Sequence, residues 1–294
     1  MTTIPSLRHD AQHHADSLPP LLAEAQHLAA SVTLGAHGRR HVGAGEEFWQ
    51  YRNAHSGDSL RSIDWRRSAR GDSHYIRQME WQAAQSVLLW IDGAQSMEFS
   101  GASMRGTKGA RATVLGLACA ILLSRAGERA GLVDDPRPPR TGEGQIDRMA
   151  AQLLLRESAE ARPDYGLPGE PHFPTGSRAV FLSDFLGDWP AIAATISRAA
   201  DRGVTGVLLQ VLDPIEEEFP FDGRTEFRSM SGALKFETLR ARGLKESYLE
   251  RLAKRKEEIT ETCRRIGWRS SLNHTSEQAL PALLWLYAAL EKVR

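Results

Sequence analysis

The sequence has little cysteine, no net charge and no long hydrophobic run. Its two cysteines, Cys119 and Cys263, are spaced neither like a zinc site nor like a disulfide framework, so a reducing compartment is expected. The nearest approach to a membrane span, residues 110–124, is shorter than the roughly 18 to 20 apolar residues that cross a bilayer. The start of the chain also lacks the residue order of a signal peptide. These absences predict a cytoplasmic protein without direct membrane insertion.

Acidic and basic side chains balance, because 37 Asp and Glu residues stand against 37 Lys and Arg residues. No global field therefore attracts nucleic acid or an anionic membrane. Apolar residues make up 41% of the chain and charged residues 25%, which is typical of a globular protein. The phosphate-loop pattern G-x-x-x-x-G-K-[ST] and the nucleophile-elbow pattern G-x-S-x-G are both missing. The chain by itself is not expected to hydrolyse nucleotides or esters.

Beyond residue 86, short apolar runs alternate with helix-like stretches. The first run, 87–92, has the continuous apolar character of a strand buried on both faces of a parallel sheet. Prolines and glycines between 157 and 177 predict an irregular loop. The alternation predicts an α/β fold with a doubly wound, mostly parallel sheet. The other predicted strands are 130–134, 178–183, 204–212, 224–229, 234–237 and 268–273, and the predicted helices are 107–126, 144–157, 189–201, 245–266 and a last helix starting near Thr275 or at Pro281.

The composition changes twice along the chain, which predicts three parts. Residues 1–34 are expected to form a tail and one amphipathic helix over 17–32. Residues 35–82 interleave glycines with arginines and aromatics, which favours loops and short strands. Residues 83–294 are expected to form the sheet domain with a C-terminal extension.

Three consecutive blocks in the second part carry a family resemblance. Residues 43–52 read GAGEEFWQYR, residues 57–65 read GDSLRSIDW and residues 68–70 read SAR. They match the patterns G-x-G-x-E-F-x-x-Y-R, G-D-x-x-R-x-I-D-W and S-A-R in order and spacing, and an apolar strand ending in Asp92 follows. The sequence thus resembles the domain-of-unknown-function 58 family, and the likeness covers most of the chain.

This resemblance implies a fold and a class of partner more than a reaction. The implied fold is similar to a von Willebrand factor A domain, with the Gly/Arg-rich β and loop region, residues 35–82, packed on the core. Family members often accompany MoxR-type AAA+ ATPases, in pairs thought to help mature or assemble other proteins. The implied partners are therefore a MoxR-type AAA+ ATPase and an unknown client protein.

The resemblance also implies a degraded metal site at the carboxyl edge of the sheet. Von Willebrand factor A domains coordinate Mg²⁺ there through Asp-x-Ser-x-Ser, a loop threonine and a later aspartate, since Mg²⁺ prefers hard oxygen ligands. In this chain Asp92 and Ser96 match, while Ala94 replaces the middle serine. Asp184 follows a later predicted strand and is the candidate acidic ligand. The loop threonine has no supported counterpart, because Thr175 lies in Pro-rich sequence.

Two interpretations of Asp92, Ser96 and Asp184 are open. In the first, they still bind Mg²⁺. In the second, the aspartates end strands and accept hydrogen bonds from helix N-termini and from Ser96, while water or a Lys or Arg side chain occupies the metal position. The second is favoured, because one hydroxyl ligand is gone and the threonine is unplaced. Either way, the rim around these residues is the expected partner surface.

The signature blocks supply a second set of candidate residues for partner binding. They are Glu47, Arg52, Asp58, Arg61, Asp64, Trp65 and Arg70. The basic and aromatic residues over 61–77 suit phosphates or stacked bases, but interspersed aspartates favour ion pairing and packing. In that interpretation Asp58 and Asp64 hold arginines and Trp65 is a core anchor.

The resemblance therefore implies a non-enzymatic adaptor that holds a client for a MoxR-type ATPase. One alternative is a metal-dependent or phosphate-handling enzyme that uses Asp92, Ser96 and Asp184. It is disfavoured because no general base or activated nucleophile accompanies them recognisably. A less favoured alternative is a nucleic-acid binder that uses residues 61–77, whose binding would depend strongly on salt.

Overall fold

A computed structural model describes residues 20–32, 39–43, 47–55, 58–59, 63–69, 71, 73–159, 161–169, 172–230, 232 and 235–291. The chain divides into two compact units. The larger unit contains residues 1–35 and 86–294, and the smaller unit contains residues 36–85. The three signature blocks of the sequence fall within the smaller unit.

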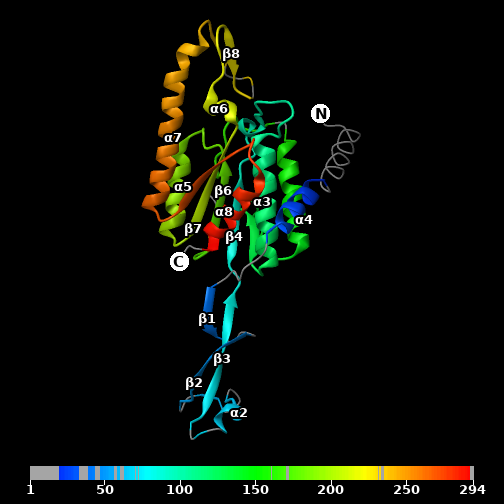
Figure 1. Cartoon of the computed structure of the whole chain (residues 1–294), viewed down its shortest axis with the longest axis vertical. Coiled ribbons are helices and arrows are strands. Elements are labelled where there is room, and N and C mark those ends of the chain that lie inside the picture. Colours follow the sequence, from blue (N-terminus) through cyan, green and yellow to red (C-terminus); the bar gives the residue numbers. More distant parts are fainter. Residues whose placement is uncertain are drawn as a thin grey trace. The chain divides into compact units, whose positions relative to one another are not determined.

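The larger unit is built on a five-stranded parallel sheet with the order β10-β7-β6-β4-β5 (Figure 1). The chain enters at β4, adds β5 on one side and then adds β6, β7 and β10 on the other. This order reverses direction between β4 and β6, and such a switch point leaves a crevice at the carboxyl ends of the strands. The strands span Ser86–Ile91 (β4), Arg129–Leu132 (β5), Arg178–Ser183 (β6), Thr205–Leu212 (β7) and Arg269–His274 (β10).

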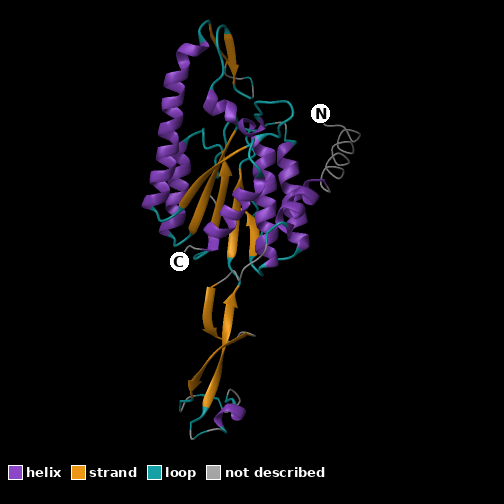
Figure 2. Cartoon of the chain, viewed as in Figure 1, coloured by secondary structure: helices purple, strands orange, loops and turns teal. Residues whose placement is uncertain are grey.

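Helices cover both faces of this sheet (Figure 2). Successive strand residues face opposite sides, so Leu89 packs with α3, α4, α8 and a helix over residues 20–30, whereas Trp90 packs with α5 and α7. The predicted doubly wound α/β fold is confirmed, in an arrangement consistent with a von Willebrand factor A-like fold. The helices span Lys108–Arg125 (α3), Glu143–Glu157 (α4), Trp189–Asp201 (α5), Lys245–Arg265 (α7) and Ala279–Glu291 (α8).

The helix α3 is almost wholly buried, because it packs against the sheet, α4 and α8. Its start is capped by Thr107, whose Oγ1 accepts a hydrogen bond from the Ala110 N–H at 3.0 Å. At Gly116 an added Cβ would lie 2.3 Å from Ile91 Cδ1, so glycine allows the helix to approach β4 closely. Cys119, in the same helix, is a free thiol whose pKa burial raises to about 12.

A short extension follows β7 at the carboxyl edge of the sheet. Helix α6 (Pro214–Glu218) begins with Pro214 and with a capping box between Asp213 and Glu216. An antiparallel hairpin of β8 (Thr225–Arg228) and β9 (Lys235–Thr238) comes next, then the 3₁₀ turn η3 (Ala241–Leu244). The ring of Phe219 lies 5.0 to 5.7 Å from the rings of three other aromatics, so the extension has its own apolar cluster. These aromatics are Phe221, Phe227 and Tyr248.

The smaller unit is a three-stranded antiparallel sheet with the order β1-β3-β2. The loops and short strands predicted for this region are present, although β3 is longer than expected. Its strands are Arg39–Gly43 (β1), Glu47–Asn53 (β2) and Tyr75–Ala83 (β3), and a one-turn helix α2 spans Trp65–Ser68.

The last helix starts at neither predicted position. It begins at Ala279, so Pro281 is its third residue. Proline is tolerated there because the N–H groups of the first turn have no partner within the helix. Among the residues that the structure describes, no helix is both long and apolar enough to cross a membrane.

Candidate functional site

Three neighbouring strands of the central sheet each end in an aspartate. Asp92 follows β4, Asp184 follows β6 and Asp213 follows β7, and none is more than 3% exposed. Because the strands are parallel, their carboxyl ends share one edge, and Asp92 and Asp184 flank the switch point. The fold therefore brings the two predicted aspartates together, with Ser96 close by in the 3₁₀ turn η2 (Gln95–Glu98).

The Asp92 carboxyl group is enclosed by its own neighbours. Its Oδ1 accepts a hydrogen bond from the Ala94 N–H at 2.9 Å, and its Oδ2 accepts one from the Ser183 hydroxyl at 2.6 Å. A Cβ added at Gly166 would lie 2.0 Å from Asp92 Oδ1, so the loop backbone covers the group. Burial raises the pKa of Asp92 from 3.8 to about 6, although the Ser183 hydrogen bond opposes this rise.

Ser96 is held by its backbone and not by its side chain. Its N–H donates to the Asp164 carbonyl at 2.8 Å, as the Gln95 N–H donates to the Pro163 carbonyl at 2.9 Å. The residue is 8% exposed, and its buried hydroxyl has no hydrogen-bond partner among the described residues. That hydroxyl is therefore available to a ligand in the neighbouring cavity.

Lys108, the first residue of α3, places a buried ammonium group at this edge. It is 1% exposed, and its Nζ donates to Asp184 Oδ2 at 2.8 Å and to Glu216 Oε1 at 2.6 Å. The same Nζ lies 5.7 Å from the ring centre of Phe99. Burial by itself lowers the pKa of Lys108, but the charges of Asp184 and Glu216 outweigh burial and raise it. The ammonium is thus charged at neutral pH and shared by two carboxylates.

The donor set at this edge does not fit Mg²⁺. That ion requires a near-octahedral set of oxygens and usually retains water. Ala94 offers no hydroxyl, Asp92 lies under loop backbone, and Asp184 is bound by the Lys108 ammonium. Within the described part of the chain, no group of three or more His, Cys, Asp or Glu side chains is arranged to hold a metal. A lysine supplies positive charge at Asp184 instead.

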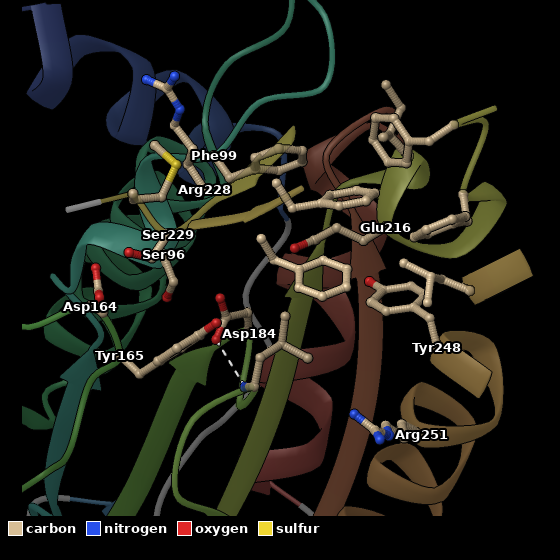
Figure 3. A pocket seen from close by; sticks show the side chains of 18 of the residues that line it. Ser96, Phe99, Asp164, Tyr165, Asp184, Glu216, Arg228, Ser229, Tyr248 and Arg251 are labelled. Carbon is tan, nitrogen blue, oxygen red and sulfur yellow. Dashed lines mark hydrogen bonds between the residues drawn. The ribbon is translucent and has the colours of Figure 1, made fainter. Parts of the chain in front are cut away.

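A cavity of about 640 Å³ opens beside Lys108. Its polar floor includes Ser96, Asp184 and Glu216, and in Figure 3 the two carboxyl groups lie between the side chains of Tyr165 and Tyr248. Its walls are mainly aromatic and aliphatic, which is the usual composition of a ligand pocket. The apolar lining includes Phe99, Leu186, Ile215, Phe219, Phe227 and Phe236.

Asp213, the third aspartate, accepts hydrogen bonds from several segments at this edge. Both Asp213 carboxylate oxygens accept hydrogen bonds from Arg105 Nη1 at 3.1 Å, and Oδ2 accepts one from the Thr275 hydroxyl at 2.8 Å. Burial by itself raises the pKa of Asp213, but these and backbone hydrogen bonds outweigh it and hold the pKa below its usual range. Asp213 therefore ties together the segments that follow β7, β10 and η2.

The signature residue Asp64 organises the turn of the smaller unit. Its Oδ1 accepts from the Arg67 N–H at 3.0 Å as the cap of α2, and its Oδ2 accepts from the Tyr51 hydroxyl at 3.1 Å. The Arg67 guanidinium lies 4.3 Å from the Tyr51 ring centre. Asp58 Oδ2 accepts from the His55 N–H at 2.7 Å. Both aspartates thus shape the local backbone.

The expectation that Trp65 is a core anchor is wrong. Its side chain is 56% exposed, and its ring packs edge-on against His74 with centroids 5.6 Å apart. A one-turn helix on a three-stranded sheet has little interior in which to bury an indole. Arg61, Arg70 and the side chains of Glu47 and Arg52 lie outside the described residues.

Lys108, Glu216 and the aromatic wall of the cavity are not predicted from the sequence as parts of one site. The sequence does contain a pattern that could single out Lys108, since it is a charged residue at the start of a largely apolar helix. A pattern also exists for Glu216, because Asp213 and Pro214 precede it in the order typical of a helix start. No sequence pattern indicates the aromatic wall, because only packing brings Tyr248 onto the phenylalanines.

The fold and the edge cavity define a doubly wound α/β protein with a ligand-sized cavity at its topological switch point. The family described as "Protein of unknown function DUF58" matches residues 50–258. This is more than half of the chain, so the chain belongs to that family, as its three signature blocks predict. No curated protein and no solved structure matches it.

Proposed function

We propose that this protein is a non-enzymatic, cytoplasmic interaction protein that holds a client polypeptide for a MoxR-type AAA+ ATPase. The observation that carries the proposal is the cavity of about 640 Å³, whose walls are mainly apolar. Lys108, Asp184 and Glu216 bind one another at its floor, so the walls above them are suited to holding apolar groups of a client. The ATPase partner comes from family membership.

An enzyme is the weaker alternative at the same residues. A general base has to reach the proton that it abstracts, but Asp92 lies under the backbone of Gly166. The Ser96 hydroxyl has no hydrogen-bonded base among the described residues, whereas a nucleophilic serine needs one. Binding therefore accounts for more of this geometry than catalysis does.

The proposal is tested by crosslinking the tagged protein in its native cells and identifying the crosslinked chains by mass spectrometry. We expect a MoxR-type ATPase and a client among them. The double variant Phe236→Ala with Met230→Ala removes two cavity side chains that are 56% and 45% exposed, so the fold should be kept. Client crosslinks should then fall several-fold.

The matched control is Leu155→Ala, which truncates a 59% exposed side chain on α4 outside the cavity. It should leave both partners at wild-type levels. Recovery of neither an ATPase nor a client from the folded wild-type protein would overturn the proposal. If Leu155→Ala lowers the client crosslinks as much as the double variant does, the cavity is not the client-binding site.

A further inference from the structure

The cavity beside Lys108 has an apolar wall that reaches the surface. Phe219 and Phe227 stack with their ring centres 5.7 Å apart, and Tyr248 lies 5.0 Å from Phe219. At the same cavity Phe236 and Met230 remain about half exposed. Clustered apolar side chains exposed in this way mark a surface that a partner covers.

Two carboxylates share one ammonium on the floor of the cavity, because Asp184 and Glu216 both bind Lys108. Two arginines also line the cavity, but Figure 3 shows Arg228 and Arg251 apart from these carboxyl groups, and the Arg228 guanidinium is paired with Glu226. Buried charge without compensation is unfavourable, so the floor itself is complementary to an additional cation.

The Ser96 hydroxyl is a second and independent sign of a ligand. It is more than nine-tenths buried, lines the cavity and lacks a hydrogen-bond partner in the described part of the chain. Figure 3 shows it on the same side of the cavity as Tyr165 and Asp184. Buried polar groups are nearly always hydrogen-bonded, and a hydroxyl oxygen accepts readily from an ammonium or guanidinium group.

Aromatic side chains around the floor also suit a cation. Lys108 already places its ammonium 5.7 Å from the Phe99 ring centre, and the rings of Tyr165 and Tyr248 line the same cavity. Ring faces attract ammonium and guanidinium groups, most strongly where water is excluded. A long aliphatic stem ending in a cation therefore matches both the wall and the floor.

We propose that the cavity binds an apolar segment of the client polypeptide through one Lys or Arg side chain. The cationic head of that side chain reaches Glu216 and Ser96, and the apolar residues beside it cover Phe236 and Met230. This inference rests on the proposed client-binding function and adds the chemistry by which the client is recognised.

The test uses three synthetic peptides that share one leucine- and serine-rich sequence and differ only at the central residue. That residue is lysine, norleucine or glutamate, and fluorescence anisotropy measures the binding of each peptide to the full chain. We expect the lysine peptide to bind at least about tenfold more tightly than the norleucine peptide, and the glutamate peptide to bind most weakly. Glu216→Gln, which keeps the helix cap but removes the charge, should abolish the preference for lysine.

The matched control is Glu143→Gln, at an exposed glutamate at the start of α4, which should keep the full preference. Equal binding of lysine and norleucine peptides, unchanged by Glu216→Gln, would overturn cation recognition while apolar client binding stands. If no peptide binds the folded chain but crosslinking recovers a client, the cavity is not the client site. Failure of both experiments would overturn the proposed function as well.

Discussion

At the scale of single residues, Asp92 and Asp184 occupy equivalent strand ends but differ in how their charge is compensated. Asp184 receives a hydrogen bond from the Lys108 ammonium. The hydrogen bonds to Asp92 come from neutral donors, the Ala94 N–H and the Ser183 hydroxyl. Neutral donors offset burial only in part, which is why the pKa of Asp92 is raised to about 6.

This raised pKa predicts a pH-dependent effect of Asp92→Asn. Between pH 3.8 and about 6 the folded protein keeps the Asp92 proton that the unfolded chain releases. The contribution of Asp92 to the free energy of unfolding therefore falls as the pH rises through that interval, by about 3 kcal/mol in total. Asparagine does not titrate, so in urea unfolding the variant should gain up to about 3 kcal/mol over the wild type between pH 4 and pH 7.

The control for this comparison is Leu155→Ala, at an exposed residue of α4 whose side chain does not titrate. Its difference from the wild type should stay the same at every pH. A difference for Asp92→Asn that is equally flat would show that Asp92 is ionised in the folded protein throughout the range.

Lys108→Met is expected to be strongly destabilising at neutral pH. It removes the ammonium and leaves Asp184 and Glu216 as buried carboxylates without their shared cation. Breaking a buried ion pair in this way costs about 3 to 5 kcal/mol, which urea unfolding measures. Adding Asp184→Asn and Glu216→Gln to Lys108→Met should recover most of the loss, because no buried charge is then left uncompensated. No recovery in the triple variant would assign the effect of Lys108 to packing.

Among the elements, the loop between α4 and β6 covers the Asp92 carboxyl group. Its carbonyls at Pro163 and Asp164 accept from the N–H groups of Gln95 and Ser96, and Arg162 donates to Glu98 at 2.7 Å. The irregular loop predicted from its prolines and glycines is confirmed, but nothing in that composition indicates that it covers Asp92.

Gly166→Ala is expected to loosen this loop. The added Cβ would meet the Asp92 carboxyl group at 2.0 Å, and that group is fixed by its own hydrogen bonds, so the loop has to move. Amide hydrogen exchange at Gln95 and Ser96 should become faster by at least about tenfold, because their acceptors move with the loop. Gly106→Ala, where a Cβ meets nothing within 4 Å, is the control and should leave both rates unchanged. Unchanged exchange in Gly166→Ala would contradict the close approach.

At the scale of the whole molecule, the larger unit draws its sheet and both its apolar cores from residues outside 36–85. We therefore expect it to fold when residues 36–85 are replaced by a short Gly/Ser linker from Gly35 to Ser86. Near-ultraviolet circular dichroism should keep the signals of its buried tryptophans, and thermal unfolding should stay cooperative. Loss of the near-ultraviolet signal in the excised protein would show that the smaller unit is needed for folding.

Local sequence patterns are enough to predict the order and type of most elements, and the family. Continuous apolar runs such as β4 and β6 predict buried parallel strands without knowledge of their neighbours, because a strand covered on both faces needs apolar residues on both. The aspartates that end these strands follow from the same pattern, since parallel strands present their carboxyl ends at one edge.

The contacts between charged groups at that edge depend on long-range packing. Lys108 donates hydrogen bonds to Asp184 and Glu216, which lie 76 and 108 residues further along the chain. These contacts depend on the order of the strands in the sheet, which hydrophobic periodicity does not encode. The contacts of Gly166 with Asp92 and of Tyr248 with Phe219 depend on long-range packing in the same way. Tertiary structure also explains why Trp65 is not the predicted core anchor. An aromatic side chain in a short surface helix is exposed when its unit has no deep interior. Local patterns specify which faces are apolar, whereas long-range packing specifies which charged groups share one cavity.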